Sequence, residues 1–115
     1  MKVIIAGSRD IVDMQVLEEA LKDSKFTVTE VVCGGARGAD TLGRLWAEKH
    51  DIPVRMFLAQ WNKYGRSAGY RRNDEMAQYG DSLIALWDGQ SRGTQHMIQS
   101  MNKLNKTVFV STSKV

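Results

Sequence analysis

The sequence has few of the residues that build disulfide scaffolds and metal sites. Its 115 residues include one cysteine, Cys33, and two histidines, His50 and His96. A single cysteine excludes an internal disulfide, and because Cys33 lies within an apolar run we expect a small buried side chain in a reducing compartment. The histidines have no cysteine or glutamate pattern beside them, so no metal site is expected. We expect His50 to end a helix, and His96 to lie one turn into another helix, close to the ligand site.

Long apolar runs are also absent. None approaches the roughly 18 residues that a membrane span needs. Only four apolar residues follow Lys2 at the N-terminus, too few for a signal peptide. We therefore expect a cytoplasmic protein with no membrane partner. The excess of basic over acidic residues is small, 16 against 13, which permits phosphate binding but gives little support for bulk coating of nucleic acid.

What the sequence does have is a regular alternation of apolar, β-branched runs with segments of helical period. A length of 115 residues and an apolar content of 43% suit a single globular domain over residues 1–115. The alternation predicts an α/β, Rossmann-like three-layer domain, with a five-stranded parallel sheet of order 3-2-1-4-5 and helices on both faces. The expected strands are Lys2–Ala6, Glu30–Cys33, Val54–Leu58, Ser82–Trp87 and Thr107–Val110, and the expected helices are Asp13–Lys22, Ala39–His50, Gly69–Tyr79 and Thr94–Leu104.

Three details of this layout carry separate expectations. Segment 59–68, AQWNKYGRSA, is polar and contains glycine, so we expect an irregular loop there. Helical period predicts that the second helix turns Leu42, Leu45 and Trp46 inward, and it places Met97 and Met101 on one face of the fourth helix. These two methionines either pack in the core or form a dimer seam.

Small residues followed by arginine come after three of the strands. Ligands of an open α/β sheet bind outside the carboxyl ends of the strands, where the strand order reverses, here between the first and fourth strands. Glycine permits positive φ and close approach, helix N-termini attract anions, and arginine makes charge-assisted bonds to phosphate. Asp40 and Thr94 could cap helices or bond ligand hydroxyls. The three corners are Gly7, Ser8 and Arg9; Gly34, Gly35, Arg37, Gly38 and Asp40; and Asp88, Gly89, Ser91, Arg92, Gly93 and Thr94. Their convergence predicts a site for a ligand that bears phosphate.

Aromatic and basic residues alternate between residues 61 and 73. Trp61 and Tyr64 could stack on a base while the basic residues pair with phosphates. The alternative is that Trp61 pins a loop to the sheet edge and the arginines begin a solvated helix. The basic residues are Lys63, Arg66, Arg71 and Arg72, of which Arg72, together with Asn73, is the better candidate for ligand binding.

Common catalytic fingerprints are missing. The sequence has neither the GxxxxGK[ST] loop of NTPases nor a clean GxGxxG, which argues against an ordinary NTPase or NAD dehydrogenase. Ser8 and Ser91 have no convincing general base in the sequence, so covalent catalysis is not indicated.

At these residues the chain resembles the YspA-related branch of the SLOG superfamily, which also includes DprA and the LOG phosphoribohydrolases. The resemblance spans nearly the whole chain. It rests on GSRD (7–10), VVCGGARGAD (31–40), FLAQWNKYGRSAGYRRNDEM (57–76), DSLIALWDGQSRGTQHMI (81–98) and KTVFV (106–110). It implies a Rossmann-like fold that binds nucleotides, their derivatives or, in DprA, DNA, and a bacterial or phage source.

The resemblance also implies where catalysis would fail. LOG enzymes use an arginine of an RK-like motif, matched here by Arg72 with Asn73, and a glutamate of PGGxGTxxE. Gly93 and Thr94 match the GT of that motif, but Met97 stands at the glutamate position. A thioether cannot act as a general acid or base, so phosphate binding would survive and LOG-type hydrolysis would not. Glu75 is a spare carboxylate nearby.

Three functions follow as hypotheses. The first is binding of a nucleotide or nucleotide derivative by a sensor, carrier or sequestering protein, with Trp61 or Tyr64 covering the base. The second is a hydrolase of N-glycosidic or phosphoester bonds, for which Asp88, Glu75 and Arg72 are catalytic candidates. The third is DprA-like binding of single-stranded nucleic acid. No cofactor is assigned beyond the nucleotide-derived ligand, and relatives that self-associate make a homodimer or higher homo-oligomer an expected partner.

Overall fold

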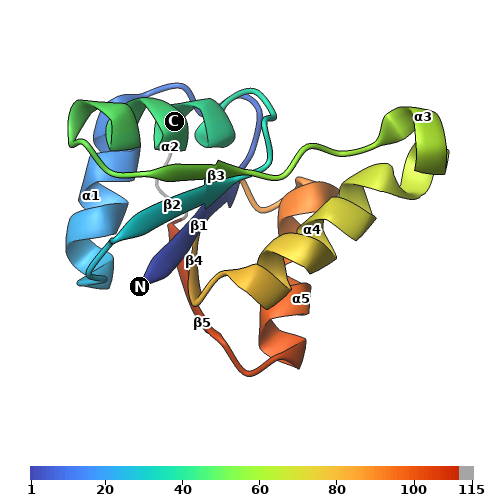
Figure 1. Ribbon diagram of the computed structural model, residues 1–115. Helices are drawn as coiled ribbons and strands as arrows, with labels where there is room; N and C mark the ends of the chain where they lie inside the picture. Colours follow the sequence, from blue (N-terminus) through green and yellow to red (C-terminus); the bar gives the residue numbers. More distant parts are fainter. Residues whose placement is uncertain (112–115) are drawn as a thin grey trace.

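The computed structural model describes residues 1–111 and shows a sheet between two layers of helices (Figure 1). The five strands are all parallel in the order β3-β2-β1-β4-β5, which confirms the predicted Rossmann-like α/β fold and strand order. The strands are β1 (Lys2–Gly7), β2 (Glu30–Cys33), β3 (Val54–Met56), β4 (Ser82–Leu86) and β5 (Thr107–Ser111). The helices are α1 (Met14–Ser24), α2 (Ala39–Lys49), α3 (Trp61–Tyr64), α4 (Ala68–Tyr79) and α5 (Arg92–Lys103), with a 3-10 turn, η1 (Gly65–Ser67), between α3 and α4.

Each face of the sheet has its own apolar core. Helices α1 and α2 cover one face and α4 and α5 cover the other (Figure 1). Because successive side chains of a strand point to opposite faces, Val3 and Ile5 of β1 pack under α1 and α2, while Ile4 and Ala6 pack under α4 and α5. All five residues of β4 are buried, as predicted for a strand that is covered on both faces.

Helix α2 approaches the sheet closely through small residues. Ala39, Gly43 and Ala47 are buried at intervals of four, and a Cβ on Gly43 would lie 3.0 Å from Cβ of Ile5. This stripe determines which side of the helix faces inward, and Leu45 lies off it. Leu45 is therefore 42% exposed, and the prediction that it points inward is wrong.

Segment 59–68 is not the irregular loop that its composition predicts. Residues 61–67 form α3 and η1, because the Gln60 carbonyl accepts hydrogen bonds from Lys63 N and Tyr64 N and Gly65, with φ 58, redirects the chain. Neither element has a buried residue, so no apolar period in the sequence reveals it. In Figure 1, α3 projects beyond the edge of the sheet.

Helix α4 is fixed at its C-terminal end by a lysine from the turn before β5. Lys106 Nζ donates hydrogen bonds to the carbonyls of Ala77 (2.7 Å), Gln78 (3.0 Å) and Gly80 (2.8 Å). A cation at this position satisfies carbonyls that have no partner within the helix.

Buried sulfur side chains complete the core. Met97 and Met101 of α5 are 1% and 0% exposed and belong to the core under α4 and α5, so they are core residues rather than a dimer seam. Self-association itself stays a prediction. Cys33 is fully buried, and burial, followed by the charge of Asp40, raises the pKa of its thiol to about 11. The predicted role of Cys33 as a small core residue is confirmed. Among residues 1–111, no helix has the length and apolarity needed to cross a membrane.

Candidate functional site

A cavity of about 360 Å³ opens at the carboxyl ends of β1 and β4. Strand order reverses between these two strands, so the cavity lies where open α/β sheets bind their ligands. Its volume falls in the range of small-molecule sites, roughly 300–1,000 Å³. The walls come from the end of β1, the turn before α2, the middle of α4 and the turn that leads into α5. The lining residues are Ala6, Gly7, Ser8, Arg9, Ala36, Asp40, Arg72, Asn73, Met76, Asp88, Ser91, Gly93, Thr94 and Met97.

At the cavity, the residues that follow β1 contact the residues that follow β4. A Cβ on Gly7 would lie 2.2 Å from the Leu86 carbonyl oxygen, so only glycine fits between β1 and β4. Ser8 N donates to the Leu86 carbonyl at 2.9 Å, and Ser8 Oγ accepts a hydrogen bond from Asp88 N at 3.1 Å. These contacts fix the position of Asp88 relative to the end of β1.

The glycine-rich turn after β2 is closed by its own carboxylate. Asp40 Oδ2 accepts hydrogen bonds from Gly34 N (3.0 Å) and Ala36 N (3.2 Å). Asp40 is 6% exposed, and burial raises the pKa of its carboxyl to about 6, although the Ala36 amide, the charge of Arg72 and the Gly34 amide each lower it. Asp40 does not cap α2, since Gly38 holds the N-cap position. A Cβ on Gly38, which has φ 77, would lie 2.5 Å from the Ser8 carbonyl oxygen.

The turn after β4 is built in the same way. Asp88 Oδ1 accepts hydrogen bonds from Gln90 N and Ser91 N, both at 2.8 Å, and these bonds hold the pKa of its exposed carboxyl below the usual value. Ser91 caps α5, because its Oγ accepts from Thr94 N at 3.4 Å, so Thr94 is not the cap. In both turns, a carboxylate of the chain itself therefore accepts hydrogen bonds from some of the backbone amides. Gly93, in the first turn of α5, keeps an amide that has no partner within the helix.

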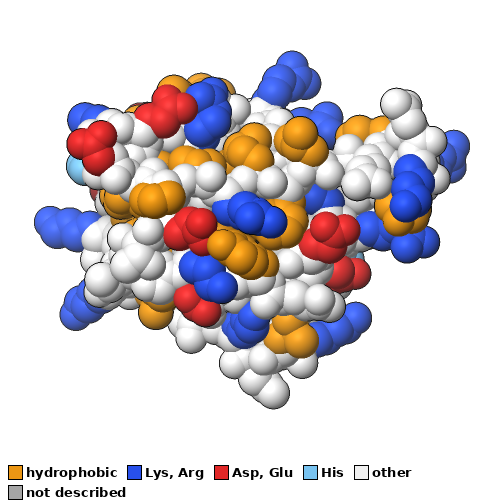
Figure 2. All heavy atoms as spheres, in the orientation of Figure 1, with side chains coloured by type: hydrophobic (Ala, Val, Ile, Leu, Met, Phe, Trp, Pro, Cys, Tyr) orange, Lys and Arg blue, Asp and Glu red, His pale blue; other side chains and the backbone are white. Residues whose placement is uncertain are grey.

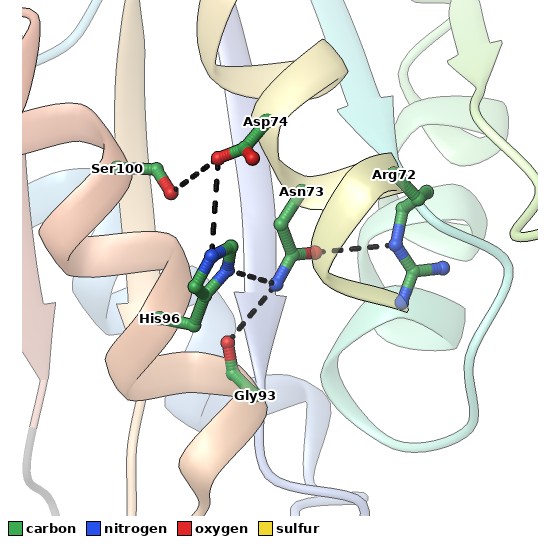
Figure 3. A network of polar contacts seen from close by, with 6 residues as sticks. All are labelled: Arg72, Asn73, Asp74, Gly93, His96 and Ser100. Atoms are coloured by element: carbon green, nitrogen blue, oxygen red, sulfur yellow. Dashed lines mark hydrogen bonds and ion pairs between the residues drawn. The ribbon is translucent and has the colours of Figure 1, made fainter. Parts of the chain in front are cut away.

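Two polar side chains of α4, those of Arg72 and Asn73, line the cavity, and Figure 3 shows their contacts. Arg72 Nη1 donates to the Gly34 carbonyl, and Arg72 Nε donates to Asn73 Oδ1 at 3.2 Å. Asn73 is 6% exposed and donates from Nδ2 to the Gly93 carbonyl at 3.1 Å. Arg72 and Asn73 therefore connect the turn after β2 to the start of α5.

The structure brings many of the predicted corner residues to one cavity and leaves others beside it. Lining positions are held by Gly7, Ser8, Arg9, Asp40, Arg72, Asn73, Asp88, Ser91, Gly93 and Thr94. Residues outside the lining are Gly34, Gly35, Gly38 and Gly89, which shape turns, and Arg37, Arg92 and Trp61, which are exposed. Ligand contact by any of these residues stays a prediction.

The catalytic candidates separate in the same way. Asp88 and Arg72 line the cavity, whereas Glu75 is exposed and lies outside the lining. Met97 lines the cavity, so the position that corresponds to the LOG glutamate faces the site with a thioether. The apolar lining residues Ala6, Ala36 and Met76 were not among the predicted site residues. Of these, Met76 could have been found, because it lies one helical turn after Arg72.

The aromatic and basic segment forms a separate surface. Trp61 is 56% exposed, and its ring lies 3.4 Å from where a Cβ on Gly69 would be, so it packs on α4 rather than on the sheet edge. The Arg71 guanidinium lies 4.3 Å from the ring centroid of Tyr64. Figure 2 shows Lys and Arg side chains gathered on the projecting part of the molecule, where Figure 1 places α3 and the start of α4.

Comparison with known proteins gives three consistent similarities. Residues 1–64 match the model of the YspA, cpYpsA-related SLOG family. The Gene 61 protein of Mycobacterium phage D29 is 36% identical over 112 residues, with 89% of each chain covered. DNA processing protein A (DprA) from Streptococcus pneumoniae has a similar fold, with a TM-score of 0.79 at 16% identity over 99% of this chain. The chain spans about half the length of that DprA chain, of which 51% is covered.

Proposed function

Because the chain belongs to the YspA, cpYpsA-related SLOG family, we propose that its edge cavity binds a nucleotide or nucleotide derivative through the phosphate group. The protein would act as a sensor, carrier or sequestering protein for this ligand. The observation that carries the proposal is the meeting of Arg9, Arg72 and the N-terminus of α5 at one cavity. Guanidinium groups and helix N-termini are the groups with which proteins bind phosphate.

The carboxylates in the cavity favour a nucleotide over a simple anion. Asp40 and Asp88 line the same cavity as Arg9 and Arg72, so a bare phosphate would be repelled as well as attracted. A nucleotide carries hydroxyl donors that a carboxylate oxygen can accept, in addition to its phosphate. A mixed lining of cations and hydrogen-bond acceptors suits both parts of such a molecule.

The test begins with mass spectrometry of small molecules released from the purified full chain, followed by calorimetric titration with AMP. Arg72→Ala should weaken AMP binding by about 10- to 100-fold, the loss expected when a charge-assisted hydrogen bond is removed. Arg9→Ala serves as a second variant, because Arg9 is exposed and lines the cavity.

Arg55→Ala is the matched control, since Arg55 is exposed on β3 and lies outside the lining. It should change the affinity by less than about twofold, as a surface substitution away from the site. Failure of both Arg72→Ala and Arg9→Ala to weaken AMP binding would place the ligand elsewhere.

Hydrolysis of the bound nucleotide is a second candidate, favoured by one observation. Asp40 is buried, lines the cavity and has a carboxyl pKa of about 6, so it can exchange a proton near neutral pH. Met97 and the exposed Glu75 argue against the LOG route. Incubation of the wild-type chain with AMP, followed by NMR, should show free adenine or adenosine if this candidate holds, and Asp40→Asn should abolish their release. Unchanged AMP would eliminate it.

Binding of single-stranded nucleic acid is a third candidate, supported by the surface of α3 and the start of α4. Trp61 and Tyr70 are 56% and 45% exposed among Lys63, Arg66 and Arg71, and exposed rings among cations can stack on bases. Gel shifts with an oligonucleotide should show affinity that falls steeply with salt. Trp61→Ala should weaken the complex, and Lys103→Ala, at the end of α5, should not. No shift at low salt would exclude this candidate.

A further inference from the structure

The carboxamide of Asn73 has only one orientation that satisfies its neighbours. The Gly93 carbonyl can only accept, so it requires the Nδ2 side of the amide, which lies 3.1 Å away. Arg72 Nε can only donate, so it requires the Oδ1 side, which lies 3.2 Å away. Asn73 is 6% exposed, so water cannot readily replace either partner. Both contacts agree on the orientation shown in Figure 3.

This orientation matches one tautomer of His96. Asn73 Nδ2 points its second hydrogen at His96 Nδ1, 3.3 Å away. A hydrogen bond from Asn73 at this position requires Nδ1 to be the acceptor, and the tautomer that provides this is the one with its proton on Nε2. Nε2 in turn faces Asp74 Oδ1 at 3.8 Å, and Ser100 Oγ donates to the same carboxylate oxygen at 2.9 Å. A continuous chain of contacts therefore runs from Asp74 through His96 and Asn73 to Arg72 (Figure 3).

The surroundings of His96 contain few other charges. From α4, the facing groups are Asp74 and Tyr70, whose ring stacks on the imidazole at a centroid distance of 4.4 Å. From α5 itself, Arg92 lies one helical turn before His96. The strands under α5 contribute apolar side chains to the core beneath it. The His96 side chain is 26% exposed, so it can exchange protons with solvent.

We propose that His96 is a positioning residue of the cavity, which holds the Asn73 carboxamide, and through it Arg72 and the start of α5, in place for a phosphate-bearing ligand. Histidine changes charge between pH 5 and 8. A proton on His96 Nδ1 would face the N–H group of Asn73. Rotation of the amide would not help, because Oδ1 would then face the Gly93 carbonyl and Nδ2 would face Arg72 Nε. Protonation of His96 therefore loosens the group that positions Arg72.

The first test needs no ligand. In ¹H–¹⁵N spectra of the labelled full chain, His96 should show the Nε2–H tautomer at pH 7.5. In an Asp40→Asn background, which removes the titrating carboxyl beside Arg72, the Arg72 Nε–H signal should shift with the same midpoint as the His96 ring, while that of Arg37, outside the cavity, should not. A neutral ring protonated on Nδ1 would overturn the proposal, and so would an Arg72 Nε–H signal that does not shift as the His96 ring titrates.

His96→Asn is the matched variant, because an asparagine Oδ1 can accept from Asn73 as Nδ1 does but cannot titrate. In this variant, in the same Asp40→Asn background, the Arg72 signal should stay constant between pH 5.5 and 7.5. His50→Asn is the control, since His50 is the other histidine and flanks α2 on the opposite face of the sheet. It should leave the response of Arg72 intact, and loss of the response in this control would contradict a specific role for His96.

The second test rests on the proposed function and uses AMP as the probe. Between pH 7.5 and 5.5, wild-type affinity should fall about fivefold more than that of His96→Asn, as expected when one positioning hydrogen bond is lost. Asp40 and the phosphate of AMP titrate in both proteins, so their effects cancel in this ratio. Equal pH dependence in the two proteins would overturn the link from His96 to binding. Absence of AMP binding together with an intact NMR response would contradict the proposed function and support the positioning of Arg72.

Discussion

Replacement of Asp40 by asparagine should stabilise the protein at neutral pH, although it removes a carboxylate that accepts two hydrogen bonds. Both bonds, from Gly34 N and Ala36 N, end on the same oxygen, Oδ2. The single carbonyl oxygen of asparagine can therefore accept both. What the substitution removes is a buried negative charge, and burial is the largest cause of the raised pKa of this carboxyl.

The size of the effect follows from the shift in pKa. Folding raises the pKa of Asp40 from 3.8 to about 6, and each pKa unit corresponds to about 1.4 kcal/mol. The folded state binds the proton more tightly than the unfolded state, so wild-type stability falls as pH rises from about 4 to about 6 and is then constant with respect to this group. The cost of the ionised Asp40 above pH 6 is about 3 kcal/mol.

The assay is urea denaturation of wild type and Asp40→Asn at several pH values between 4 and 7.5. The free energy of unfolding of the variant, relative to wild type, should increase by about 3 kcal/mol across this range. Groups that titrate equally in both proteins cancel in the difference. A difference that does not change with pH would refute the reasoning, because it would mean that Asp40 is not held at a cost in the folded protein.

Three further substitutions have expected outcomes in the same denaturation assay. Asp88→Asn should change stability in the opposite direction, because the Gln90 and Ser91 amides lower the pKa of Asp88; its destabilising effect should be present at pH 7 and be lost as pH falls through the pKa of this carboxyl. Gly38→Ala should lower the free energy of unfolding by more than about 2 kcal/mol, since φ is 77 and the new Cβ would lie 2.5 Å from the Ser8 carbonyl oxygen. Gly89→Ala, with φ 85 and open space around it, should lower it only by the backbone strain of about 1 kcal/mol, and equal losses would contradict the role of close packing. Lys106→Met should lower the free energy of unfolding by about 2 kcal/mol, because it removes the hydrogen bonds to the Ala77, Gln78 and Gly80 carbonyls. Lys103 is an exposed lysine of α5, so Lys103→Met should change it by less than about 0.5 kcal/mol, and similar values for the two variants would show that the hydrogen bonds of Lys106 add nothing.

The sheet could be predicted from the sequence because its signal is strong and local. Apolar, β-branched runs such as Val3–Ala6 and Ser82–Leu86 have no polar alternation, and only a parallel sheet covered on both sides buries them. The predicted end of the third strand is wrong, because β3 ends at Met56 and not at Leu58. Val54–Leu58 reads as one run, but pairing stops at Met56 because its partner strand β2 ends at Cys33.

The site could be predicted only as far as backbone position decides it. Residues that directly follow β1 and β4, such as Ser8 and Asp88, reach the cavity because strand ends share one edge of the sheet. The sequence could not show that Asp40 and Asp88 turn their carboxylates back onto amides of their own turns, since this depends on side-chain rotamers and burial. It also could not show that Arg37 and Arg92 remain exposed outside the lining, because a turn presents neighbouring residues in different directions.

The hydrogen bonds that Lys106 makes at the C-terminal end of α4 limit how the molecule can change shape when a ligand binds. Lys106 is bonded to the last turn of α4, and Arg72, nearer the beginning of α4, is bonded to the Gly34 carbonyl. The helix is therefore held at two points. A sliding movement of α4 would break the hydrogen bonds at both points. Movement of the segment that precedes the helix would leave both contacts intact, and Gly65 in that segment has φ 58 and open space around its Cβ position.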